Sequence, residues 1–277
     1  MKTVEQLRHF YSELVCARAE IADRRVARAF ATVCREDFMG PGPWKVSVPG
    51  GYLDTGTDNP AVLYQDLVFA IVPEERINNG EPSLHAVCLD ALSIRSGEPA
   101  LHIGIGNGYY IPILAELVGN SDQLHAIEVE HRLAEEAAKY LAIRWNVSVS
   151  CQSGAEGPLP ESDIIYVNAG ATQPLFAWLE ALTIGGRLLF PLTPGLGWGA
   201  MLLVTRQPQG FDARFITRAR FIPYIGGQNE RDRRRLAAAF GDSSWRQVRS
   251  LRIDERPTNG DCWYSGDGWW LSTNELE

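Results

Sequence analysis

The stretch that decides the fold is "ALHIGIGNGYYIPILAELVG", residues 100–119. Its first residues are apolar and suit a buried strand, its glycines suit a tight turn, and the part from Tyr109 to Val118 suits a helix. Pro112 is compatible with that helix because it lies in the first turn. A strand, a glycine turn and a helix in this order commonly hold a nucleotide-like cofactor. The spacing of the glycines indicates which one.

The glycine turn, "GIGNG" at residues 104–108, has the spacing G-x-G-x-G. The dinucleotide pattern G-x-G-x-x-G requires a glycine at position 109, where this chain has Tyr109. In dinucleotide folds that third glycine lets the helix lie close to the strand while a pyrophosphate sits at the helix N-terminus, and a tyrosine would push the helix away. The tighter spacing favours a cofactor without a pyrophosphate, and S-adenosylmethionine is such a cofactor.

Three features farther along the chain support the same cofactor. Glu128 ends the predicted strand "LHAIEVE", where a carboxylate can accept hydrogen bonds from both ribose hydroxyls, and Glu130 lies two residues on. The stretch "CQSGAEG" (151–157) predicts a turn in which Ser153 and Ala155 contact an adenine. A later strand ends in "YVNAGA" (166–171), which places Asn168 at the carboxyl edge of the sheet, where ligands bind in open α/β folds.

The order of the predicted elements indicates the fold class. From about residue 99 to 193 strands alternate with helices, including a helix, a Gly185-Gly186 turn and a strand in "PLFAWLEALTIGGRLLFPL" (174–192). The strands "AMLLVTRQ" (200–207) and "ARFITRARFIPYI" (213–225) follow with too short a gap for a crossover helix, so we expect them to pair antiparallel. We predict an α/β, Rossmann-like methyltransferase fold whose mostly parallel, seven-stranded sheet is closed by this antiparallel hairpin.

The remaining segments flank this core. Residues 3–38 predict a helical N-terminal lead-in, and the Gly- and Pro-rich residues 39–60 predict a connection with little regular structure. We expect a helical and substrate-segment region over residues 1–98, a cofactor-binding domain over 99–228 and a C-terminal extension over 229–277. In the extension, the arginines of "ERDRRRLAAAF" (230–240) predict a solvated helix face, and Trp263, Trp269 and Trp270 predict packing or an interface.

Composition narrows the class of protein. The formal charge of −8 disfavours a nucleic-acid partner. No segment approaches the roughly 20 apolar residues of a membrane span, and the N-terminal residues lack the apolar run of a signal peptide. The five cysteines are scattered, with no CxxC pair, which favours free thiols in a reducing compartment and no metal site. We therefore predict a cytoplasmic protein with no nucleic-acid or membrane partner.

These stretches resemble those of a known family, the protein-L-isoaspartate (D-aspartate) O-methyltransferases, over about residues 15–225. "EIADRRVARAFATVCREDFMGP" (20–41) is similar to the helical lead-in of the family, and "LYQDLVFAIVPEERINNGEPSLHAVCLDAL" (63–92) is similar to its substrate segment. The glycine stretch, "LHAIEVE", "SGAEG" (153–157) and "IGGRLLFPL" (184–192) match its cofactor segments, and "ARFIPYIG" (219–226) matches its last strand. The resemblance implies a methyltransferase that uses S-adenosylmethionine, with Gly104, Gly106, Gly108 and Glu128 as cofactor contacts.

The chain also departs from the family pattern. Members usually carry Thr-Ile-Ser-x-Pro in the substrate segment, with the serine hydroxyl near the transferred methyl, but here residues 78–82 are "NNGEP" and Gly80 takes the place of that serine. His102 replaces the acidic residue usual before the first glycine, and Ser153 replaces the aspartate usual in the adenine turn. Because Glu128 remains, we expect cofactor binding to be retained, whereas isoaspartyl specificity does not follow from the resemblance.

Methyl transfer from a sulfonium is an in-line displacement, so the site mainly aligns the acceptor with the methyl group. A carboxylate acceptor needs hydrogen-bond donors and no base, and we predict the donors at Asn78, Asn79, the Gly80 N–H, Ser83 and His85. A hydroxyl or amine acceptor would need a proton acceptor, for which the predicted residues are Asp66 and His85. We favour a carboxylate.

The predicted cofactor-binding set collects the residues around the glycine turn and the three later strand ends: His102, Gly104, Gly106, Asn107, Gly108, Tyr109, Glu128, Ser153, Gly154, Ala155 and Asn168. The predicted partner is a peptide, protein or small-molecule methyl acceptor. Two other functions stay open: a catalytically silent relative that binds the cofactor or a partner protein through its Trp-rich tail, and a nicotinamide-dependent oxidoreductase, which the glycine spacing opposes.

Overall fold

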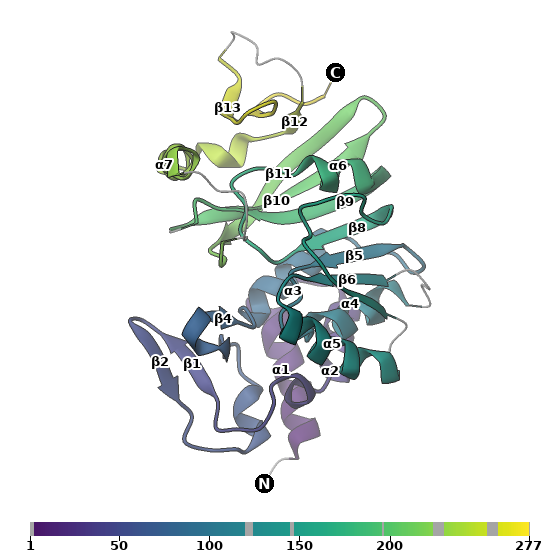
Figure 1. The fold of residues 1–277 in the computed structure, drawn as a ribbon, viewed down its shortest axis with the longest axis vertical. Helices are drawn as coiled ribbons and strands as arrows, with labels where there is room; N and C mark the ends of the chain where they lie inside the picture. Colours follow the sequence, from purple (N-terminus) through teal and green to yellow (C-terminus); the bar gives the residue numbers. More distant parts are fainter. Residues whose placement is uncertain are drawn as a thin grey trace. The chain divides into compact units, whose positions relative to one another are not determined.

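The computed structural model describes residues 3–119, 124–144, 147–195, 197–223, 230–253 and 260–276. The fold is α/β and Rossmann-like, with a large mixed sheet (Figure 1). The chain divides into two compact units, residues 1–153 and residues 154–277, and each is described by itself. The three-part division expected from the sequence stays a prediction. Part of the predicted last strand, residues 224–226, lies outside the described residues.

The first unit begins with the helical lead-in. Thr3 and Gln6 form a capping box at the start of the first helix, and the carboxylate of Asp23 caps the second helix by accepting from the N–H of Arg25. Tyr11 and Phe30 are fully buried between these helices, with ring centroids 6.1 Å apart. The helices of the lead-in are α1 (Val4–Arg18), α2 (Arg24–Thr32) and η1 (Arg35–Phe38), and a further short helix, η2 (Pro60–Leu63), lies later in the chain.

The connection at residues 39–60 contains a β-hairpin that the sequence analysis did not expect. Strand β1 (Lys45–Val48) pairs antiparallel with β2 (Gly51–Asp54), with Lys45 opposite Asp54 and Val48 opposite Gly51. The hairpin forms because "KVSV" alternates apolar and polar side chains, and because Gly50, at φ +91°, accommodates the tight turn after Pro49. Glycine and proline here mark a turn between strands.

The parallel strands of the first unit follow the predicted order. Strand β5 (Ala100–Ile103) pairs with β6 (Leu124–Glu128), and β6 pairs with β7 (Val147–Cys151), all parallel. Helix α4 (Tyr110–Val118) follows β5, and α5 (His131–Arg144) follows β6 and packs against β6 and β7. The other elements of this unit are β3 (Ala70–Val72), η3 (Pro73–Glu75), β4 (Ile77–Asn78) and α3 (Pro82–Ala91).

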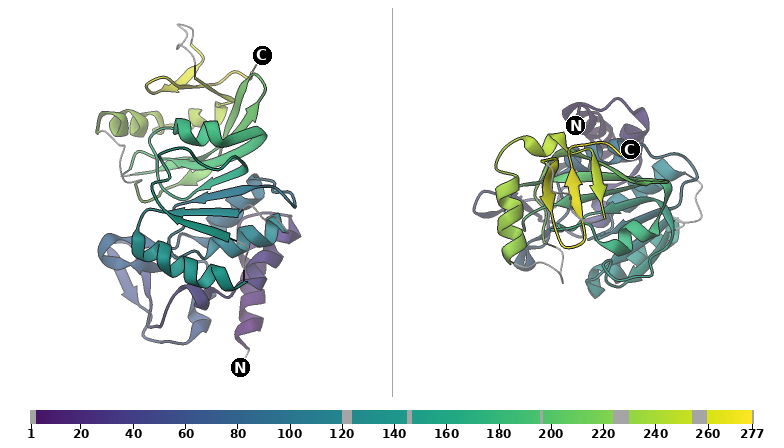
Figure 2. Two further views of the ribbon diagram at one scale, coloured as in Figure 1. Left: turned by 45° about the vertical axis from the view of Figure 1, so that its right-hand side comes forward. Right: turned by 90° about the horizontal axis from the view of Figure 1, so that it is seen from above.

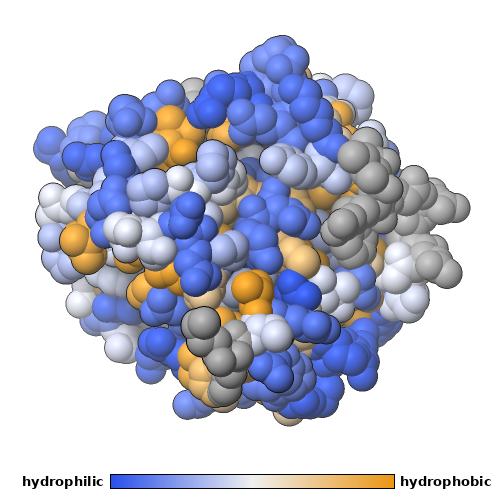
Figure 3. All heavy atoms as spheres, turned by 90° about the horizontal axis from the view of Figure 1, so that it is seen from below, coloured by the Kyte–Doolittle hydropathy of each residue, from blue (hydrophilic) through white to orange (hydrophobic). Residues whose placement is uncertain are grey.

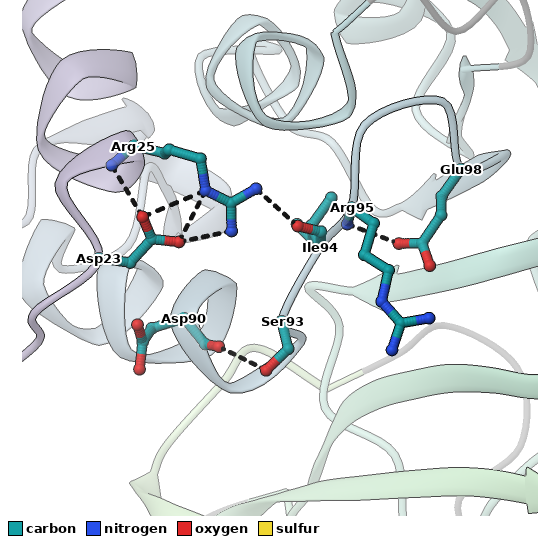
Figure 4. A network of polar contacts seen from close by, with 7 residues as sticks. All are labelled: Asp23, Arg25, Asp90, Ser93, Ile94, Arg95 and Glu98. Carbon is teal, nitrogen blue, oxygen red and sulfur yellow. Dashed lines mark hydrogen bonds and ion pairs between the residues drawn. The ribbon is translucent and has the colours of Figure 1, made fainter.

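A polar network joins the lead-in to the segment that enters β5. The guanidinium of Arg25 donates to both carboxylate oxygens of Asp23 and, through Nη1, to the carbonyl of Ile94 at 2.9 Å (Figure 4). The N–H of Arg95 donates to the carboxylate of Glu98 at 2.8 Å in the same turn. These contacts fix the lead-in against the turn between α3 and β5.

The second unit contains the predicted antiparallel hairpin, but the hairpin does not end the sheet. Strand β8 (Ser162–Val167) pairs parallel with β9 (Leu182–Leu192), and β10 (Gly199–Gln207) pairs antiparallel with both β9 and β11 (Gly210–Ala219). Strand β11 then pairs with β12 (Ser250–Arg252), β12 with β14 (Trp270–Ser272), and β14 with β13 (Cys262–Ser265). The sheet therefore extends beyond the expected closing hairpin, and the predicted count of seven strands is not confirmed.

Helix α6 (Phe176–Ala181) ends earlier than predicted, and Gly185-Gly186 lies within β9 instead of before it. The register explains this difference: Ser162 of β8 faces Leu182, but Ile164 faces Arg187, so β9 carries extra residues in a bulge. Gly185, at φ +81°, accommodates the bulge.

The C-terminal extension forms an aromatic cluster on β11. The ring of Phe215 lies 5.5 Å from that of Phe240, 5.6 Å from that of Trp245 and 5.3 Å from that of Trp263. Helix α7 (Glu230–Ala239) and η4 (Ser244–Gln247) bring Phe240 and Trp245 to this cluster, and Figure 2 shows the extension in yellow-green and yellow. Trp269 is also buried, in agreement with a packing role. The described residues of the extension are thus a folded part of the second unit.

The exposed residues are of mixed polarity. On the face seen in Figure 3, hydrophobic residues lie scattered among hydrophilic ones, which is usual for protein surfaces. In the described part of the chain, no helix is both long and apolar enough to span a membrane.

A buried arginine holds the lead-in to the segment before β3. Arg35 is fully buried, and its guanidinium donates to the carbonyls of Leu63 at 2.7 Å, Gln65 at 2.9 Å and Leu67 at 3.0 Å. Its guanidinium carbon also lies 5.0 Å from the ring centroid of Phe69. Carbonyl oxygens and an aromatic face therefore stabilise this cation in the interior.

Replacement of Arg35 tests this anchor. Arg35→Met should lower the free energy of unfolding by about 3 kcal/mol or more, because hydrogen bonds from a charged donor contribute roughly 1.5–3 kcal/mol each and the buried carbonyls would lose them. Arg28→Met, on the exposed side of α2, is the matched control and should change it by less than about 0.5 kcal/mol. Urea unfolding of both variants measures the difference, and equal effects would contradict the anchor.

Candidate functional site

The glycine turn lies where the sequence placed it, at the carboxyl end of β5. Gly104, Gly106 and Gly108 have φ of +74°, +56° and +83°, a region that residues with a Cβ rarely adopt. The N–H of Gly104 donates to the carbonyl of Ile127 at 2.8 Å, which continues the β5–β6 ladder into the turn. A Cβ at Gly108 would lie 3.2 Å from the Cβ of Ala137, so α5 approaches the turn closely. Backbone conformation therefore explains all three glycines.

Glu128, at the end of β6, faces this turn. Its Oε2 accepts from the N–H of Gly106 at 2.8 Å, and its Oε1 accepts from the N–H of Val129 at 2.9 Å and of Glu130 at 3.1 Å. The residue is only 7% exposed. Burial raises the pKa of Glu128, and the three backbone N–H groups oppose that shift. The carboxylate is thus held at the glycine turn in one orientation.

This arrangement fits the predicted cofactor. A carboxylate oxygen has roughly two acceptor positions, and among the described residues Oε2 accepts only from Gly106. The remaining acceptor position of Oε2 can take a hydrogen bond from a donor such as a ligand hydroxyl. Among the described residues, no group of three or more His, Cys, Asp and Glu side chains is arranged to hold a metal ion.

Two other predicted residues of the turn direct their side chains into the protein. The Nδ2 of Asn107 donates to the carbonyl of Phe38 at 2.8 Å, and its Oδ1 accepts from the N–H of Tyr109 at 3.3 Å. Tyr109 is fully buried, with its hydroxyl 3.5 Å from that of Tyr11 and its ring 5.9 Å from that of Phe38. These side chains join the glycine turn to the lead-in.

The remaining predicted cofactor residues lie near strand ends. Ser153 follows β7 at the end of the first unit and is half-buried. In the second unit, Gly154 is buried and its carbonyl accepts from the Nε1 of Trp178 at 2.6 Å, while Ala155 is half-buried beside it. Asn168 directly follows β8, at the carboxyl end of that strand. Their contacts with a cofactor stay predictions.

The predicted acceptor segment begins in the antiparallel β3–β4 hairpin at Asn78 and continues into the first turn of α3. Asn79 is buried, and its Oδ1 accepts from the N–H of Phe69 at 2.9 Å. The N–H of Gly80 donates to the Oδ1 of Asn78 at 3.0 Å. A Cβ at Gly106 would lie 3.5 Å from the Cδ1 of Ile71, so this hairpin lies beside the glycine turn.

Asp66 caps helix α3 from outside the helix. Its Oδ1 accepts from the N–H of Ser83, in the first turn of α3, at 2.9 Å. Its Oδ2 lies 3.1 Å from the Nε of Arg18, and the Asp66 side chain is 1% exposed. Both carboxylate oxygens of Asp66 therefore contact a donor within the protein.

The two histidines of the predicted site are both buried. His85 is 2% exposed and stacks on Tyr110, with ring centroids 3.6 Å apart and ring planes within 13°. Burial holds the pKa of His85 well below its ordinary value, and His102 and Arg35 lower it further. Burial also lowers the pKa of His102 to about 3. Both imidazoles are neutral at pH 7.

The sequence analysis missed two residues that organise this region. Tyr110 is predicted only as part of a helix. It follows the glycine turn, and a residue that stacks on its ring, as His85 does, therefore lies close to the site. Arg35 is one of several charged residues in the lead-in, so the sequence offers no signal that distinguishes it as the buried one.

Comparison with known proteins gives a consistent result. The sequence matches the model of the protein-L-isoaspartate(D-aspartate) O-methyltransferase family over residues 12–229. A protein-L-isoaspartate O-methyltransferase of Ignicoccus hospitalis is 30% identical over 168 residues, which cover 59% of this chain and 79% of the relative. One of Methylorubrum populi is 30% identical over 216 residues, which cover 76% of this chain and 96% of the relative.

Two solved structures share the fold. A protein-L-isoaspartate O-methyltransferase superposes with a TM-score of 0.65 at 24% identity, over 79% of this chain and 66% of that one, just under two thirds of its length. A Plasmodium falciparum protein assigned to the same group of enzymes, solved in complex with S-adenosyl-L-homocysteine, superposes with a TM-score of 0.64 at 17% identity. That match covers 79% of this chain and 99% of the other.

Substitution of Glu128 tests the predicted ribose anchor. Glu128→Ala should weaken S-adenosylhomocysteine binding tenfold or more, because a hydrogen bond to a charged group contributes roughly 1.5–3 kcal/mol. Since the pKa of Glu128 is raised, protonation should already weaken binding above pH 4.5, the ordinary value for glutamate, and Glu128→Gln should remove that pH dependence. Calorimetric titrations between about pH 7 and pH 5 measure both effects. Unchanged affinity in Glu128→Ala would show that the anchor is elsewhere.

Proposed function

Because the chain belongs to the protein-L-isoaspartate(D-aspartate) O-methyltransferase family, we propose that it methylates the free carboxylate of an isoaspartyl or D-aspartyl residue in a peptide or protein. The chain is an S-adenosylmethionine-dependent methyltransferase. This excludes the nicotinamide-dependent oxidoreductase considered from the sequence. The family match over residues 12–229 carries the acceptor part of the proposal, and the Glu128 carboxylate held against the Gly106 N–H supports the cofactor part.

The cofactor supplies an electrophilic methyl group on a sulfonium when it is bound. An acceptor carboxylate forms a bond from one oxygen to the methyl carbon as the carbon–sulfur bond breaks, which leaves a methyl ester and a neutral thioether. No proton has to move in this step. The chain therefore has to bind and align the acceptor and exclude water, and it needs no general base.

We place the acceptor at the β3–β4 hairpin and the start of α3, residues 78–85. The Cδ1 of Ile71, in β3, would lie 3.5 Å from a Cβ at Gly106, so the hairpin lies beside the glycine turn. This proximity supports that position for the acceptor. The groups considered as bases for a hydroxyl or amine acceptor are poorly suited to that role. Asp66 is paired with Arg18 and bound to the N–H of Ser83. Burial holds the pKa of His85 well below its ordinary value, which makes its imidazole a weak proton acceptor. A carboxylate acceptor is the better match because it needs neither group to accept a proton.

A different peptide or small-molecule acceptor is the second candidate. This candidate is supported because two of the predicted donor residues already have hydrogen-bond partners within the protein. The N–H of Gly80 donates to the side chain of Asn78, and the side chain of Asn79 accepts from the N–H of Phe69. These groups would have to exchange partners to bind an isoaspartyl carboxylate. The peptide assay below separates the two candidates.

The proposal predicts selectivity between two isomeric peptides. With S-adenosylmethionine labelled in its methyl group, the chain should transfer label to an isoaspartyl peptide and at least tenfold less to the same peptide with ordinary aspartate. The product should release methanol on mild base treatment, as a carboxyl methyl ester does. Equal labelling of both peptides, or none, would favour the second candidate.

Asn79 tests the position of the acceptor. Asn79→Ala should lower turnover tenfold or more, because the buried amide fixes the hairpin at Phe69, and should change S-adenosylhomocysteine affinity by less than about twofold. Asn59→Ala is the matched control, since the Oδ1 of Asn59 also accepts a backbone N–H but is exposed. Initial rates and calorimetry on both variants are the measurements. Normal turnover in Asn79→Ala would place the acceptor elsewhere.

A further inference from the structure

Gly80 has no room for a side chain, and the obstacle is His85. Gly80 has a φ of +69°, between β4 and α3. A Cβ at this position would overlap the Nε2 of His85 and lie 2.9 Å from its Cδ2, closer than real Cβ atoms approach a neighbour. The edge of the imidazole therefore occupies the space that any other residue at position 80 would fill.

The face of the same imidazole lies against the start of helix α4. His85 stacks on Tyr110 with ring centroids 3.6 Å apart and ring planes within 13°. Tyr110 is the first residue of α4, two positions after Gly108 of the glycine turn. One ring thus contacts Gly80 with its edge and the helix that follows the cofactor turn with its face.

The surroundings leave this ring little freedom to move. Its own helix, α3, is capped by Asp66 through the N–H of Ser83. On the other side, the N–H of Gly80 is bound to the side chain of Asn78. His85 is 2% exposed, so packing on all sides restricts the movement of its ring.

We propose that His85 is a positioning residue for methyl transfer, wedged between Gly80 and Tyr110 so that its imidazole sets the separation of the acceptor segment from the cofactor turn. This inference rests on the proposed function, because it takes residues 78–80 as part of the acceptor site. A misplacement of about 1 Å in a displacement reaction can cost roughly a hundredfold in rate. Disturbing the wedge should therefore lower kcat and leave cofactor binding intact.

The first arm of the test adds a methyl group at Gly80. Gly80→Ala should lower kcat on the isoaspartyl peptide at least tenfold and change the S-adenosylhomocysteine Kd by less than twofold. Gly56→Ala is the matched control, because Gly56 has a similar φ of +64° but no atom within 4 Å of the place its Cβ would take. It carries the same backbone strain without the contact and should leave both constants within twofold. Equal kcat for the Gly80 and Gly56 variants would overturn the proposal.

The second arm changes the wedge itself. His85→Ala removes the ring and should lower kcat at least tenfold at an unchanged Kd. His85→Gln places a flat amide of similar reach on Tyr110 and should recover most of the lost kcat. If His85→Gln is as impaired as His85→Ala, or if His85→Ala keeps normal kcat, the ring is not a spacer.

A third arm does not depend on the acceptor. In urea unfolding, Gly80→Ala and His85→Ala should not be additive, because removal of the ring removes the obstacle to the new methyl group. The unfolding equilibrium constant of the double variant should be at least fivefold smaller than the constant calculated by adding the effects of the two single variants. Additivity would overturn the wedge.

The arms separate this inference from the proposed function. If the wild-type chain does not methylate the isoaspartyl peptide, the proposed function fails, and the unfolding cycle alone decides whether the wedge exists. If the wild-type chain is active but Gly80→Ala and His85→Ala retain its kcat, the proposed function stands and the positioning role fails. If Gly80→Ala does not fold, the kcat of His85→Ala and His85→Gln decides in its place.

Discussion

The hydrogen bond from the Gly106 N–H to the carboxylate of Glu128 is the contact on which the site depends. It joins the turn after β5 to the end of β6 and holds the buried carboxylate of Glu128 in place. Burial raises the pKa of this carboxyl group, so its ionised form costs the folded state free energy. A second buried charge, Arg35, organises the neighbouring region by gathering the carbonyls before β3. The site is thus arranged around two buried ionic groups that are solvated by backbone.

The conformation of the glycine turn and the position of Glu128 beside it could be predicted from the sequence, for local physical reasons, while the contacts with a cofactor stay predictions. Three glycines within five residues are explained by three positive φ angles, and these leave few alternatives to a tight turn. Glu128 could be predicted because an acidic residue at the end of a buried strand must find donors, and parallel strands bring their carboxyl ends to one edge. Both inferences need only neighbouring residues and the period of the strands.

The features that the sequence did not predict depend on contacts between distant segments. The hairpin at residues 45–54 was not predicted, because glycine and proline occur both in turns between strands and in irregular loops. The extra residues of β9 follow from a register that only its neighbour β8 sets. His85 and Gly80 are five residues apart, yet their contact also needs Tyr110, on a helix beyond another strand. Sequence patterns describe one segment at a time, so they do not predict a contact among three residues from different segments.

The added strands of the C-terminal extension change what borders the sheet of the second unit. A sheet that stopped at β11 would present a row of unsatisfied peptide groups, a template on which another polypeptide can align and aggregate. Strand β12 occupies part of that border at Phe211 and Asp212, and the aromatic rings around Phe215 seal the surface next to it. For a protein whose proposed substrates are peptides or proteins, a partly covered border leaves fewer free peptide groups on which a substrate chain could pair away from the site.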